Sequence, residues 1–203
     1  MATTVTTSPL TKSGFGSDLK SSANRYRIGM WVACASILMM FTALSSAYIV
    51  RAASSTDWTP LQMPRILLVS SGLILLSSIT MEAARRKWQD ATQRPGVLLL
   101  ATIVFGLGFL VCQIFAWRQL ARQGIFVASN PHSSFFYVFT ATHGIHLLGG
   151  LLALSYLTLR RRSVPNNQGA LARSKARADA VALYWHFMDF LWIYLFVLLF
   201  FVR

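Results

Sequence analysis

Four ionisable side chains that could bind a metal or carry a proton lie inside apolar segments of this 203-residue chain. They are His143, His146, His186 and Asp189. Histidine is the commonest metal ligand and an effective proton carrier, and ionisable groups inside a membrane usually have a partner or a task. Spacings of three residues place His143 and His146 on one helix face, and His186 and Asp189 on another. The spacing therefore predicts two polar patches on two helices.

Three kinds of chemistry suit such patches: a metal or haem site, a proton path, or hydrogen bonds between helices. A di-iron site in a bundle needs several glutamates in Glu-x-x-His spacing, which are missing here. Haem is not excluded by spacing alone. A continuous proton path is not expected, because Asp189 is the only deep carboxylate and the interior lacks Arg and Lys. The favoured interpretation is hydrogen bonding between packed helices, with Gln113 as a neutral polar partner, and no catalytic or metal site is expected.

Five apolar segments must position these side chains, and each approaches the ~20 residues that cross a bilayer. Residues are 55% hydrophobic and 12% charged, about half the charge of a soluble domain. Because lipid leaves unpaired backbone groups unsatisfied, the spans must be helical. The predicted fold is all-α, a polytopic membrane bundle of five transmembrane helices. We expect a flexible polar tail over residues 1–25 and a transmembrane domain over 26–203, with spans at about 28–50, 64–84, 96–117, 134–159 and 181–202.

Lysine and arginine are distributed unequally between the two ends of these spans. Fourteen of the 19 lie on the side of the N-terminus and five on the other. The positive-inside rule predicts a cytoplasmic N-terminus and an outside C-terminus. The net charge of +13 is thus explained by orientation rather than by nucleic-acid binding. Cys34 and Cys112 fall at different depths, so we expect no bond between them.

Depth along the spans suggests one specific contact. At ~1.5 Å per residue, His146 lies ~18 Å from the outer side and Asp189 ~12 Å from the inner side. These depths are level in a core ~30 Å thick, so we hypothesise a contact between His146 and Asp189. His132 is expected to be solvated in the outer loop, and Glu82 to reach the headgroups. The basic, Ala-rich residues 160–180 are expected to form the longest loop.

Several of these residues occur in ordered motifs. The first span has Gly29-Met30-Trp31 and Ser36, and the third has Gly-x-Gly-Phe at 106–109 followed by Gln113. The fourth has Thr140-x-x-His143-Gly144-x-His146, and the fifth has Tyr184-Trp185-His186-Phe187-x-Asp189. Over residues 26–203 the chain resembles subunit III of the haem–copper terminal oxidases, which comprise cytochrome c and quinol oxidases.

The resemblance implies a five-helix bacterial subunit without redox metal, packed beside subunit I, and subunit II, of a respiratory oxidase. Haem and copper would belong to the partner. Members hold phospholipid in a cleft between helices and sustain proton uptake by subunit I. The polar residues of the bundle would then have structural roles, between helices or at the lipid cleft: His143, His146, His186, Asp189, Gln113 and Trp185.

The chain departs from the family pattern at three carboxylate positions. Ile37 stands where a glutamate usually follows the span-one serine, and Ala116 replaces a second glutamate. Asp179 stands where a glutamate is common. The loss at residue 37 removes the group most often linked to protons, so the resemblance favours a scaffold and lipid-holding role.

Three alternatives stay open at this point. The chain could serve a nitric oxide reductase as a subunit III-like partner. It could be a small free-standing transporter, which would need a water-filled polar path. It could also be a haem- or metal-binding electron carrier.

Overall fold

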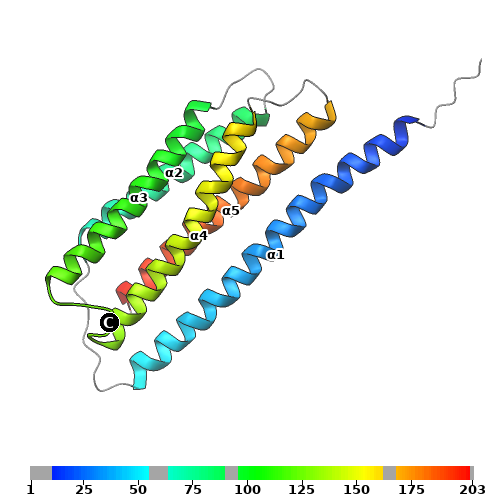
Figure 1. Ribbon diagram of the computed structural model, residues 1–203. Helices are drawn as coiled ribbons and strands as arrows, with labels where there is room; N and C mark the ends of the chain where they lie inside the picture. Colours follow the sequence, from blue (N-terminus) through cyan, green and yellow to red (C-terminus); the bar gives the residue numbers. More distant parts are fainter. Residues whose placement is uncertain (1–10, 55–63, 90–95, 162–167, 202–203) are drawn as a thin grey trace, which may run out of the picture.

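Five helices make up the computed structural model, which describes residues 11–54, 64–89, 96–161 and 168–201. Within these ranges all regular secondary structure is helical, and each helix contains a stretch long and apolar enough to cross a membrane. The predicted all-α bundle of five membrane helices is confirmed. The helices are α1 (Thr11–Ser54), α2 (Ile66–Gln89), α3 (Gly96–Arg122), α4 (Pro131–Arg161) and α5 (Gln168–Phe201) (Figure 1).

Two helices begin earlier than the apolar pattern predicts. α1 starts at Thr11, so part of the stretch assigned to a tail is helical, and α5 starts at Gln168. The prediction of a loop over residues 160–180 is therefore wrong for its second part. Alanine is the strongest helix former, and the Ala-rich run after Gln168 continues the last span beyond its apolar portion. Residues 1–10 lie outside the described part, and the division into tail and membrane domain stays a prediction.

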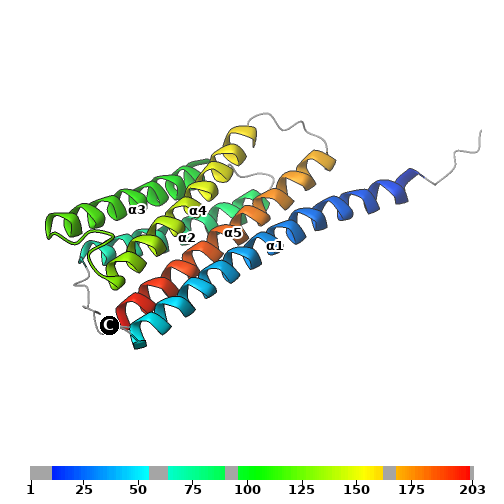
Figure 2. The ribbon, with the colours of Figure 1, turned by 60° about the horizontal axis from the view of Figure 1, so that its bottom comes forward.

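The helices pack unevenly. α2 and α3 form the most extensive pair, while α5 contacts α1, α2 and α4. Within the described residues α1 touches α4 and α5 but neither α2 nor α3. Figure 2 shows α1 lying alongside α5 at one side of the bundle. The largest fully buried side chains include Trp185 and Trp192 of α5, so α5 supplies the centre of the core.

The bundle has two chemically different ends. The end that contains the first turns of α5 and the last turns of α2 carries most of the described basic residues, and we call it the basic end; they are Arg25, Arg27, Arg85, Arg86, Lys87, Arg173, Lys175 and Arg177. At the opposite end a tight turn joins α3 to α4. Gly124 takes φ 74° there, and the Ile125 amide donates to the Leu120 carbonyl at 3.0 Å, which is the Schellman ending that favours glycine.

Candidate functional site: the polar interior of the bundle

A row of serines on α2 accepts hydrogen bonds from two neighbouring helices. Trp185 Nε1 of α5 donates to Ser77 Oγ at 3.1 Å, and Trp192 Nε1 donates to Ser71 Oγ at 3.0 Å. Ser77 Oγ also donates to the backbone carbonyl of Thr102 on α3 at 3.2 Å. Since serine is small, α2 can approach both neighbours closely while still offering a polar atom. Two buried indole rings are thereby fixed in place.

Gln113 and His143 lie in the same buried region but differ in their partners. Gln113 Nε2 of α3 donates to Ser70 Oγ at 3.3 Å. The ring of His143 is fully buried and packs against Phe109 and Trp192, with ring centroids 5.7 and 5.2 Å away. Neither of its ring nitrogens forms a hydrogen bond with the described residues. His143 therefore acts here as a packed aromatic ring.

His146 does not meet Asp189. Its Nδ1 donates to the Thr142 carbonyl of its own helix at 2.7 Å, and its ring lies edge-on to Phe41 of α1, 6.0 Å between centroids. Neither carboxyl oxygen of Asp189 has a hydrogen-bond partner among the described residues. The hypothesis of a His146–Asp189 contact is wrong because equal depth does not fix rotation about the helix axis. His146 faces Phe41 of α1, whereas Asp189 of α5 lies near Ser78 of α2.

The predicted solvation of His132 is also wrong. Its side chain is 0% exposed, and its ring lies 5.9 Å from that of Tyr48 on α1. α4 begins at Pro131, so His132 belongs to the first helical turn and is covered by α1. Sequence alone placed it in a loop because the polar Asn130 to Ser134 segment interrupts the apolar pattern.

An ion network at the basic end was not predicted as a site. Arg85 binds the Glu82 carboxylate through Nε and Nη2, at 2.8 and 2.9 Å, and reaches Asp179 Oδ1 of α5 at 3.4 Å. Glu82 Oε1 also accepts from Arg86 Nε at 2.9 Å, so Glu82 is held by arginines. His186 completes the network, with Nε2 3.7 Å from Glu82 Oε2 and Nδ1 sharing a 2.7 Å hydrogen bond with Ser78 Oγ.

The signal for this network was present in the spacing. Glu82 and Arg85 are three residues apart on α2, and Asp179 and His186 are seven apart on α5. Both spacings place the pair on one helix face. The missing information was that these two faces meet, which requires the packing of α2 against α5.

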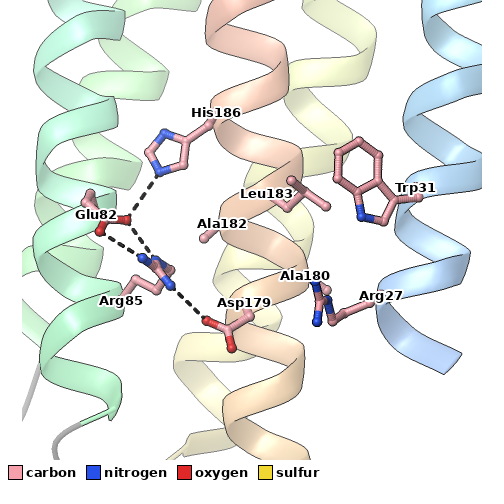
Figure 3. Close-up of a pocket in the computed structure, with 9 residues that line it drawn as sticks. All are labelled: Arg27, Trp31, Glu82, Arg85, Asp179, Ala180, Ala182, Leu183 and His186. Atoms are coloured by element: carbon pink, nitrogen blue, oxygen red, sulfur yellow. Dashed lines mark hydrogen bonds and ion pairs between the residues drawn. The ribbon is translucent and has the colours of Figure 1, made fainter. Parts of the chain in front are cut away.

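A pocket of about 390 Å³ lies beside this network. Figure 3 shows Glu82 and Arg85 on its α2 side, and Arg27 and Trp31 of α1 on the other. Between them α5 contributes Asp179, His186 and small or apolar side chains. The pocket thus occupies the space at the basic end where α1 and α2 are not in contact.

The described residues contain no group of three or more His, Cys, Asp and Glu side chains arranged to hold a metal ion. His143 and His146 share α4 but face different helices, and His186 lies on α5 beside α2. The three histidines of the apolar segments are therefore dispersed, and no single site gathers them.

The three positions at which the resemblance predicts altered carboxylates differ in environment. Ala116 is fully buried in the core and Ile37 packs against the core from α1. Asp179 keeps a carboxylate and makes the ion pair with Arg85. Hence Ile37 and Ala116 lie within the packed part of the bundle, and the Asp179 carboxylate lies at the basic end.

The outward faces of the helices are strongly apolar. On α3 the exposed residues recur every three or four positions and are about half or more exposed: Val97, Leu100, Val104, Leu107, Val111, Ile114 and Phe115. On α1 the exposed set includes Trp31 and Met39. Such faces are stable only against lipid or a partner.

Comparison with known proteins identifies the family. The model for cytochrome c oxidase subunit III matches residues 12–203. A probable cytochrome c oxidase subunit 3 of Mycobacterium bovis is 32% identical over 191 residues, covering 89% of each chain. The cytochrome bo(3) ubiquinol oxidase subunit 3 of Pseudomonas putida is 28% identical, covering 85% of this chain and 84% of its own. The quinol oxidase subunit 3 of Bacillus subtilis is 24% identical, covering 88% of each. The chain therefore belongs to the cytochrome c oxidase subunit III family.

Proposed function

We propose that this chain is the non-catalytic subunit III of a bacterial haem–copper terminal oxidase and packs beside subunits I and II. In this assignment haem and copper are held by the partner subunit, and subunit I reduces oxygen and pumps protons. The family match over nearly the whole chain supports the oxidase class. The relatives include subunits named for cytochrome c and for quinol oxidases, and the electron donor is a property of the other subunits.

The observation that carries the proposal is the use of polar side chains within the bundle. Trp185, Trp192, Gln113 and His186 each bond a serine of α2, so the polar atoms join helices rather than converge on a ligand. A bundle built in this way is a rigid scaffold. Its apolar outer faces on α1 and α3 offer the contact area that a membrane partner requires.

The lipid-holding part of the role is assigned to the pocket between α1 and α2. Arg27 and Trp31 line it at the basic end, where a cationic side chain suits a phosphate group and an indole suits the membrane interface. Acyl chains would then follow the space between α1 and α2. Neutralising Arg27 as Arg27→Gln should lower the phospholipid retained per purified complex, whereas Lys87→Gln, exposed at the same end outside the pocket, should not. Equal phospholipid content in both variants would contradict this placement.

We assign the orientation of the bundle in the membrane from the distribution of Lys and Arg. The basic end carries the described Lys and Arg clusters, so it is assigned to the cytoplasmic side of the inner membrane. The N-terminus is then cytoplasmic and the C-terminus lies outside. Because Ile37 and Ala116 replace family carboxylates, the support given to subunit I does not use those two groups.

The decisive experiment is purification of the tagged chain in mild detergent, followed by deletion of its gene. Haem-containing subunit I should co-purify with the tagged chain. Deletion should leave initial oxygen consumption largely intact and shorten the time over which turnover continues. Recovery without a haem protein, or a deletion strain with unchanged oxidase lifetime and assembly, would refute the proposal. If the tagged chain co-purifies with a nitric oxide reductase, the chain would be assigned to that enzyme instead.

A further inference from the structure

Asp189 is a buried acid without a hydrogen-bond partner. It is 3% exposed, and neither carboxyl oxygen forms a hydrogen bond with the described residues. The Ser78 hydroxyl of α2 faces the carboxyl but does not meet hydrogen-bond geometry. An ionised carboxylate without partners is very costly in an apolar interior, and such a group takes up a proton instead.

A chain of polar groups runs from the basic end toward this acid. The Glu82 carboxylate lines the pocket and lies 3.7 Å from His186 Nε2, and His186 Nδ1 is hydrogen-bonded to Ser78 Oγ at 2.7 Å. Asp189 is three residues beyond His186, which is ~4.5 Å further along the axis of α5 on the same face. Figure 3 shows His186 above Glu82 with its ring directed to α2.

The side chain of His186 has the chemistry of a carrier between the two. It is 37% exposed, so its Nε2 edge is accessible from the pocket while Nδ1 is held at Ser78. Histidine can accept a proton on one nitrogen and release one from the other. The remaining charged or titratable groups near these side chains are Arg85 and Arg86 of α2, Asp179 of α5, Arg27 of α1 in the pocket, and the buried His143 of α4, which packs against Trp192 one turn beyond Asp189.

We propose that Asp189 is a protonated acid whose proton exchanges with the water at the basic end through His186 and Ser78. In the outward step the Asp189 carboxyl proton passes to Ser78 Oγ, the Ser78 hydroxyl proton passes to His186 Nδ1, and the His186 Nε2 proton leaves to water in the pocket. In the return step a proton from the pocket binds His186 Nε2 and the same transfers run in the opposite direction, which restores the protonated Asp189. The number of protons and the net charge are unchanged. This inference does not rest on the proposed function, because it concerns exchange at rest and needs no oxygen reduction.

Infrared spectroscopy of the full chain in its purified membrane complex tests the proposal. The carbonyl-stretching band of a protonated carboxyl should be lost in Asp189→Asn and displaced in Asp189→Glu, which keeps the acid. Transfer to D2O should shift the wild-type band. If Asp189→Asn does not assemble, Asp189→Glu still assigns the band.

Exchange kinetics then test the route. His186→Gln and His186→Phe should slow the D2O-induced shift at least tenfold, since acid–base groups within hydrogen-bond reach accelerate proton transfer by about 10²–10⁴-fold. The matched control is His146→Gln, because His146 faces α1 and bonds its own backbone; its exchange rate should equal that of the wild type. The proposal is overturned by an assembled protein without an Asp189-dependent acid band, or by an unaltered exchange rate in both His186 variants.

Discussion

Replacing Gly106 with alanine tests how closely α3 packs against Trp185. A Cβ at this position would lie 3.0 and 3.2 Å from two atoms of the Trp185 ring and 3.1 Å from a methyl of Leu151. Carbon atoms in contact prefer about 3.5–4.0 Å, so the added methyl is roughly half an ångström too close to each. Trp185 is 0% exposed and bonded to Ser77 at 3.1 Å, so it has little freedom to move.

The expected magnitude follows from two opposing terms. Overpacking a well-filled core costs about 1–3 kcal/mol, whereas replacing glycine by alanine inside a helix stabilises by about 0.5–1 kcal/mol. The matched control is Gly149→Ala, where nothing lies within 4 Å of the added Cβ, so only the second term acts. The Gly106 variant should therefore be about 1–3 kcal/mol less stable than the Gly149 variant.

The assay is unfolding of the purified chain in mixed micelles by a rising fraction of denaturing detergent, read by tryptophan fluorescence. Comparing the two alanine variants cancels the helix-propensity term. Equal free energies of unfolding for both variants would show that Trp185 does not pack against Gly106 as described.

Three further predictions follow from the interhelical contacts and the charge distribution. A double-mutant cycle of Trp185→Phe and Ser77→Ala should give a coupling of about 0.6 kcal/mol in the free energy of unfolding, the average for hydrogen bonds between membrane helices; additive effects would argue against the bond. Glu82→Gln should destabilise the chain by about 1 kcal/mol or less, since its ion pairs are partly exposed, and the difference from wild type should shrink at high salt; a salt-independent difference would contradict this origin. In a chain without its native cysteines, Val127→Cys should react with a membrane-impermeant thiol reagent added outside intact cells and Arg173→Cys should not; the reverse pattern would invert the assigned topology.

The number of membrane-spanning helices was predictable because lipid imposes a simple rule on composition. A run of ~20 apolar residues must cross as a helix, and all five helices contain such a run. The helix starts at Thr11 and Gln168 were missed because hydropathy marks the membrane and not the helix. Alanine-rich and polar residues continue a helix into water, where no apolar signal is needed.

The contacts between side chains were less predictable than the spans. Spacing placed His186 and Asp189 on one face of a helix, and depth placed His146 level with Asp189, but rotation about each axis is set by packing. The structure turns His146 toward Phe41 of α1, so the expected pair does not form. The serines that accept hydrogen bonds from Trp185 and Trp192 could be recognised in the sequence as small residues. Which tryptophan bonds which serine could not be predicted, because that depends on the register of α2 against α5.

The place of α1 in the bundle has a consequence for how the chain is made. Because α1 touches α4 and α5 alone among the described helices, it has no neighbour among them until those two helices have been synthesised. During that interval its apolar faces meet lipid, insertion factors or a partner subunit. The bundle therefore closes late in translation, and a chain truncated before α4 would leave its first helix detached in the bilayer.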